Sequence, residues 1–272
     1  MISLIGIGNT GCSVARELGK NSQYKVFEID EGTNVKKQKN PEEYEKSCPN
    51  FGKLLSGIDE DVFVFLSASG NISGLTLRIL EKIKSKNISV VCFNTDDSLL
   101  SSTGKLQQKI VTNVLQEYAR SGLLEKIYLV NNSNLEGLLD DIPLDQYYNK
   151  LNELFSYTFH SIMYFKNSKP LFETKEDLSD IDRISTIGLY DMENGPKPFF
   201  NMSRITKERF YFSFSKEDIK KDGKLLQNIK NKILKNENET AKTFAIFESK
   251  QTDRYGFIEF TTHIVQNSVE SA

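Results

Sequence analysis

Short apolar runs alternate with amphipathic helical patterns through the first half of the chain. Buried parallel strands read as runs rich in Ile, Val, Leu and Phe, and strand-like apolar segments of this kind occur at residues 2–5, 24–30, 62–66, 88–93 and 126–130, the second being interrupted by charged residues. Apolar positions at helical spacing lie between them, over residues 14–18, 75–86 and 105–121. This alternation predicts an α/β fold built on a Rossmann-like, doubly wound parallel sheet.

A long helix follows, and after it the alternation of strands and helices gives way to a different pattern. Pro143 suits the first turn of a helix, and the apolar pattern continues to about residue 164, a length of roughly 30 Å. After an acidic break, strands and one helix joined by hairpin-like turns predict a smaller α+β domain. We therefore place domain boundaries at residues 1–143, 144–182, 183–265 and 266–272, the last being a short polar tail.

Composition and charge exclude several classes of function. The net charge of −2 gives no electrostatic reason to expect nucleic acid, and no apolar run reaches the length of about 18 residues that suggests a membrane span. The cysteines, Cys12, Cys48 and Cys92, are odd in number and widely spaced. That spacing predicts no disulfide framework and no metal site, and it suits a reducing cytoplasm. His160 and His263 are too far apart in sequence to suggest a histidine-based site.

The turn after the first strand carries the strongest chemical signal. Gly6, Gly8 and Gly11 stand between a strand and a helix, where glycines allow close approach and the helix N-terminus attracts phosphate. The same spacing fits the dinucleotide fingerprint, with Glu28 or Asp30 placed to bind a ribose hydroxyl. The alternative is a tight turn that only packs helix on strand.

A second loop of small residues, 67–76, follows the strand at residues 62–66. Both loops lie at the carboxyl ends of predicted parallel strands, where such sheets bind their ligands. We therefore expect the two loops to share one ligand.

The order of these segments resembles the tubulin/FtsZ superfamily of filament-forming GTPases over nearly the whole chain. The first loop, residues 5–13, resembles the glycine-rich first loop of that family. The resemblance implies phosphate contacts from a run of five residues, Gly8, Asn9, Thr10, Gly11 and Cys12.

The second loop resembles the glycine–threonine signature of the family, with one clear departure. The matching positions imply phosphate contacts from Gly70, Asn71, Ser73 and Gly74. Ile72, however, stands where the family has glycine. Its branched side chain restricts the backbone and crowds a close phosphate approach.

The base-binding side also has counterparts. By resemblance, Asn132 reads guanine at the end of a strand, Tyr148 stacks on the base, and Asn152 pairs with its edge. A neutral amide both donates and accepts, which suits the edge of guanine. Taken without the resemblance, Tyr148 is explained by ordinary core packing.

The acidic break resembles the family's loop that reaches the next subunit and orients water at its γ-phosphate. The two aspartates of that pattern match Asp177 and Asp180, while Lys175 replaces its asparagine. Carboxylates can orient and polarise a water for phosphoryl transfer. A solvated acidic loop or a helix cap is the alternative. The resemblance implies an active site shared between protomers.

Three functions remain open at this stage. The first is a cytoplasmic GTP-binding protein that self-assembles head to tail into filaments and hydrolyses GTP at the contact, with GTP or GDP as ligand and Mg²⁺ as a candidate ion. The second is a diverged, non-hydrolysing structural protein with the same fold. The third, a nicotinamide-dependent oxidoreductase, has less support.

Residues 183–265 resemble the family's activation domain, and we expect no adaptor-binding tail after Val265. The short chain is nearer in length to plasmid or phage tubulin-like proteins than to cell-division members.

Overall fold

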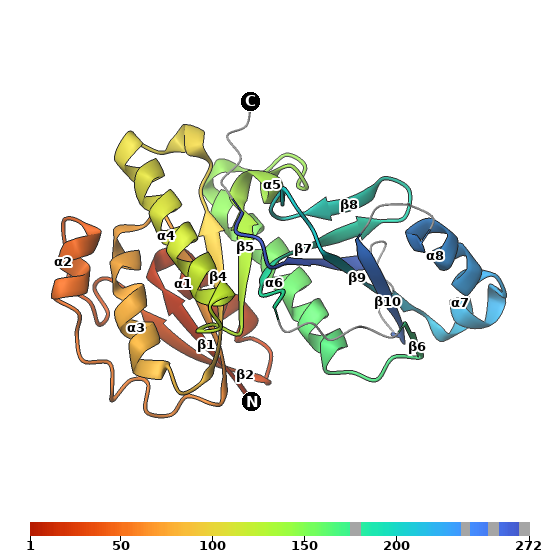
Figure 1. The fold of residues 1–272 in the computed structure, drawn as a ribbon, viewed down its shortest axis with the longest axis horizontal. Helices are drawn as coiled ribbons and strands as arrows, with labels where there is room; N and C mark the ends of the chain where they lie inside the picture. Colours follow the sequence, from red (N-terminus) through yellow and green to blue (C-terminus); the bar gives the residue numbers. More distant parts are fainter. Residues whose placement is uncertain (175–180, 235–239, 250–255, 267–272) are drawn as a thin grey trace.

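The computed structural model describes residues 1–174, 181–234, 240–249 and 256–266. Five parallel strands build the first half of the sheet (Figure 1). In spatial order they are β2 (Tyr24–Ile29), β1 (Ile2–Ile7), β3 (Asp61–Ser67), β4 (Asn87–Asn94) and β5 (Lys126–Asn131). Their registers align apolar side chains across the sheet, with Ile5 opposite both Phe27 and Val64. The parallel registers of these five strands confirm the prediction of a parallel sheet.

Helices cover both faces of this half. One face carries α1 (Gly8–Leu18), α5 (Asn132–Glu136) and the long α6 (Tyr147–Lys166), which the 3₁₀ turn η3 (Leu144–Gln146) precedes. The other face carries α2 (Pro41–Lys46), α3 (Thr76–Ile83) and α4 (Ser102–Arg120), with the 3₁₀ turns η1 (Asn71–Leu75) and η2 (Asp97–Leu99) between them. Under α6, Phe159 meets Phe63 edge to face at a centroid distance of 5.1 Å and Phe65 at 5.7 Å. These aromatic contacts fix the long helix on the sheet.

The second half extends the same sheet. Its strands are β6 (Phe172–Glu173), β7 (Ile184–Asp191), β8 (Gly195–Pro198), β9 (Lys207–Phe214), β10 (Ala241–Glu248) and β11 (Gly256–Thr262). The spatial order from β5 is β7, β11, β9, β10 and β6, and β8 forms a hairpin with β7. β9 and β10 are parallel and are joined by α7 (Lys216–Lys221) and α8 (Leu225–Leu234). The helix expected between these two strands is α8, and the structure adds the short α7 before it.

The joint between the halves is narrow. β5 and β7 pair through only two positions, Ile127 with Ile184 and Tyr128 with Ser185. α6 lies between the halves and packs on strands of both (Figure 1). The sheet is therefore continuous across the boundary that the sequence suggested near residue 183.

A buried ionic cluster lies at this joint. The carboxylate of Glu259 on β11 is 3.0 Å from the ammonium of Lys126 on β5 and 2.6 Å from that of Lys166 on α6. It also accepts hydrogen bonds from the hydroxyls of Tyr128 and Tyr211, at 3.2 and 3.4 Å. Glu259 is 3% exposed. The cluster thus ties a strand of the first half, the central helix and two strands of the second half to one carboxylate.

Two local expectations were wrong. α1 begins at Gly8 instead of near Val14, so no extended glycine loop separates it from β1. The polar residues 31–59, whose charges suggest a solvated loop and a short helix, contain that helix as α2, but Tyr44, Phe51 and Leu55 are buried in the core with α3. Over the described residues, no helix combines the length and apolarity needed to cross a membrane.

Candidate functional site

The turn between β1 and α1 is made by a single residue, Gly8, whose φ of +70° favours glycine. The flanking glycines have a packing role. A β-carbon at Gly11 would lie 2.1 Å from the carbonyl oxygen of Phe65, and one at Gly6 would lie 2.6 Å from the amide nitrogen of Cys12. The glycine spacing is therefore required for α1 to lie on β1 and β3, whatever the turn binds.

The other predicted residues of this turn lie at the start of α1. Asn9 is exposed and Thr10 is half-buried in the first turn of α1, which begins at the carboxyl end of β1. Cys12 points inward, with its thiol 3.3 Å from the carbonyl oxygen of Gly6. Burial, and next the nearby carboxylate of Asp30, raise the pKa of the Cys12 thiol to about 12. Cys12 therefore offers only its backbone to a ligand.

The second loop is folded against the protein. Its residues form η1, in which the amide of Asn71 donates to the carbonyl oxygen of Lys39 at 3.2 Å. The amide of Gln107 on α4 donates to the carbonyl oxygen of Gly70 at 2.8 Å and to the hydroxyl of Ser73 at 3.3 Å. Both side chains expected to bind phosphate thus have protein partners.

The two loops meet through Ile72 and Gly8. A β-carbon at Gly8 would lie 2.6 Å from Cγ2 of Ile72, which places this aliphatic side chain directly on the first turn. Gly74 packs as closely on the other side, because a β-carbon there would lie 2.1 Å from the carbonyl oxygen of Pro41. In this arrangement a methyl group lies against the glycine at the start of α1 and narrows the approach of a phosphate to that turn.

The base side is more open. The amide of Asn152 on α6 donates to the hydroxyl of Ser13 on α1 at 3.1 Å, which brings α6 to the first turn. Tyr148, one helical turn earlier, is 57% exposed, and this exposure excludes core packing as its role. Its neighbour Tyr147 is held by a 2.7 Å hydrogen bond to Glu136. Asn132 is half-buried as the first residue of α5.

The acidic residues that a dinucleotide site would use are engaged within the protein. The carboxylate of Glu28 pairs with Arg16 at 2.8 Å. Asp30 accepts a hydrogen bond from the amide of Glu31 at 2.8 Å. These contacts stabilise the β2 edge and give the oxidoreductase hypothesis no added support.

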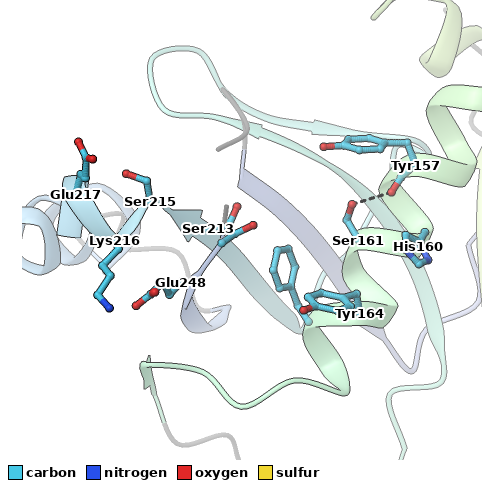
Figure 2. Close-up of a pocket in the computed structure, with 11 residues that line it drawn as sticks. Tyr157, His160, Ser161, Tyr164, Ser213, Ser215, Lys216, Glu217 and Glu248 are labelled. Carbon is cyan, nitrogen blue, oxygen red and sulfur yellow. Dashed lines mark hydrogen bonds between the residues drawn. The ribbon is translucent and has the colours of Figure 1, made fainter. Parts of the chain in front are cut away.

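A hollow of about 970 Å³ lies away from the candidate site, between α6 and the ends of β9 and β10 (Figure 2). Tyr157, His160 and Tyr164 line it from α6, and Ser215 and Glu248 face them from the second half. Ser215 serves as the N-cap of α7. This hollow contains neither of the small-residue loops.

The fold matches solved structures along almost its entire length, although no protein-family model and no curated protein matches the sequence. CetZ2 from Haloferax volcanii, solved as a GTPγS-bound protofilament, superposes with a TM-score of 0.67 at 11% identity, over 97% of this chain and 94% of that one. A GTPγS-form protofilament of Bacillus thuringiensis serovar israelensis TubZ gives 0.66 at 15% identity, over 98% and 87%. FtsZ of M. jannaschii, in an empty dimer, gives 0.64 at 12%, over 96% and 88%.

The protein has the tubulin/FtsZ fold. This confirms the fold expected from the resemblance, including the long central helix and the mixed second half. Within the tubulin/FtsZ fold, the candidate site is the carboxyl edge of β1, β3 and β5, between α1, η1 and the start of α6.

The structure adds two residues around the candidate site whose contacts the sequence does not indicate. Ser13 and Gln107 hold the predicted groups in place, but both lie far along the chain from their partners, so no local pattern marks them. Asp177 and Asp180, the predicted catalytic residues, lie outside the described residues.

Proposed function

We propose that this protein assembles head to tail into filaments and binds a guanine nucleotide at the carboxyl edge between α1 and α6. The Asn152–Ser13 hydrogen bond supports the proposal most directly, because it brings the predicted base-side helix onto the predicted phosphate turn. The exposed ring of Tyr148 adds a surface for stacking on a base. Similarity to proteins solved as protofilaments supports self-assembly, and head-to-tail contacts of that kind generate open filaments.

A second candidate function follows from one observation. Ile72 lies against Gly8 where a phosphate would approach, which favours a filament protein that assembles without hydrolysing GTP. Hydrolysis at the subunit contact, by Asp177 and Asp180, belongs to the first candidate only. Turnover measured above the assembly concentration separates the two.

We expect purified protein to sediment as filaments above a critical concentration and to bind GTP in the presence of Mg²⁺ but not NAD. Calorimetric titration and high-speed sedimentation measure the two properties separately. Protein that stays monomeric at every concentration, with and without GTP, would contradict self-assembly. Binding of NAD alone would instead favour the oxidoreductase hypothesis.

Replacing Asn152 with alanine should weaken guanine nucleotide binding about tenfold, since a hydrogen bond in a shielded site is worth about 1–2 kcal/mol. Asn149, which is exposed on the same helix, supplies the control: Asn149→Ala should bind like wild type. Ser13→Ala removes the partner of Asn152 and should reproduce part of the loss. Equal affinities for Asn152→Ala and wild type would remove α6 from the site.

A further inference from the structure

The position of Ile72 has a consequence for which part of a ligand the site accepts. Gly8, the first residue of α1, has a left-handed φ and turns its bare Cα toward η1. Cγ2 of Ile72 lies 2.6 Å from where a β-carbon of Gly8 would be. Phosphates bind helix N-termini through backbone N–H groups at close range, and the Ile72 methyl group narrows the space beside the first residue of this helix.

Ile72 is anchored in this position. Its side chain is half-buried and packs on the core cluster beneath α3, with Ile58 among its fellow members. The surrounding loop is held from α4 by Gln107 and from the α2 side by the contact of Pro41 with Gly74. Moving Ile72 away would therefore expose apolar surface and disturb contacts on two sides, and both changes oppose ligand entry.

The obstruction concerns the phosphate side alone. The base-side groups are carried by α5 and α6, where Asn152 is fixed by Ser13 and Tyr148 is exposed. Ile72 belongs to η1, which is held by α4 and by the α2 side. The two sides of the site can thus be tested independently.

We propose that Ile72 is the specificity-determining residue of the site, which admits the nucleoside part of a guanine nucleotide and disfavours its phosphates. This inference rests on the proposed guanine site. It attributes the low phosphate affinity to one side chain. A small residue at position 72 should therefore allow tighter binding of a polyphosphate.

The test compares wild type with Ile72→Ala, using GTP and guanosine as ligands with Mg²⁺ in calorimetric titrations. The matched control is Ile58→Ala, which makes the same truncation in the same core cluster away from Gly8. Thermal unfolding of all three proteins establishes that the variants are folded. We expect Ile72→Ala to bind GTP at least about tenfold more tightly than wild type, with guanosine affinity unchanged and Ile58→Ala equal to wild type.

Three results would overturn the inference. If wild type binds GTP as tightly as Ile72→Ala, Ile72 is no obstruction, and the proposed guanine site stands. If Ile72→Ala tightens GTP and guanosine equally, the residue does not select against phosphate. If neither protein binds either ligand, the inference and the guanine site both fail.

Discussion

Replacing Glu259 with glutamine should lower the free energy of unfolding by about 3 kcal/mol. The substitution keeps the shape of the side chain but leaves Lys126 and Lys166 facing each other without a counter-charge. Breaking a buried ion pair from one side typically costs about 3–5 kcal/mol. We expect the lower end of that range, because about a quarter of each lysine side chain reaches the surface.

The cluster also predicts a pH dependence. Burial alone would raise the pKa of the Glu259 carboxyl, but Lys126 and Lys166 outweigh it and hold that pKa well below its usual range. A carboxyl group with a lowered folded-state pKa stabilises the protein above its unfolded pKa of about 4.3, and this stabilisation is lost as the pH falls below it. Wild type should therefore lose more stability between about pH 5 and pH 3 than Glu259→Gln does.

The lysines carry more charge than the carboxylate balances. Burial lowers the pKa of Lys166 to about 8, although Glu259 opposes that shift. Adding Lys166→Met to Glu259→Gln should therefore recover part of the lost stability, since it removes one of two unpaired ammonium groups.

Urea unfolding at constant m-value measures these differences. Glu60→Gln is the control, because the Glu60 carboxylate that pairs with Lys86 is 64% exposed, and pairs with such an exposed partner contribute about 0–1 kcal/mol. A Glu259→Gln protein within about 1 kcal/mol of wild type would show that the cluster does not stabilise the joint.

Replacing Gly11 with alanine should destabilise the fold by more than the roughly 1–3 kcal/mol typical of overpacked cores. Its β-carbon would lie 2.1 Å from the carbonyl oxygen and 2.9 Å from the carbonyl carbon of Phe65. Both atoms belong to the backbone of β3, so the clash is relieved only by moving α1 or the strand. Soluble yield and the unfolding midpoint measure the effect.

Gly70→Ala is the matched control for that substitution. Gly70 has a φ of −76°, and its β-carbon would approach nothing closer than 3.7 Å. The change should therefore shift stability by no more than about 0.5 kcal/mol. If Gly11→Ala were as stable as Gly70→Ala, the close approach of α1 to β3 would be wrong. Loss of ligand binding in a Gly11 variant would not locate the site, because the fold is lost first.

The parallel sheet was predictable because its strands are buried on both faces and therefore read as unbroken apolar runs. β8 was not predictable from the sequence, because its residues, Gly195 to Pro198, have little intrinsic preference for a strand. The strand forms by pairing with β7. The sequence did not predict the burial of Tyr44, Phe51 and Leu55 for a related reason. These residues show no strand or helix periodicity within a polar stretch, so only the tertiary fold decides which way they face.

For the candidate site, the sequence predicts a position but not the contacts around it. Glycines after a strand mark the carboxyl edge of a parallel sheet, and a proline and aromatic residues mark the start of the central helix. The same glycines proved to be required by helix–strand packing, so their spacing could not separate packing from binding. The Asn152–Ser13 and Gln107–Gly70 contacts join distant segments, and no periodicity in a single sequence carries that information.

The place of β11 in the sheet bears on how the protein is made. β11 is the last strand in the described sequence, yet it lies between β7 and β9 and brings Glu259 to the joint. A ribosome adding about 5–20 residues per second releases β9 roughly 2–10 s before β11 is complete. Throughout that interval the facing edges of β7 and β9 have open backbone groups, and unpaired edges of this kind invite pairing with other chains. Until β11 inserts, these two edges are therefore exposed to pairing with other chains.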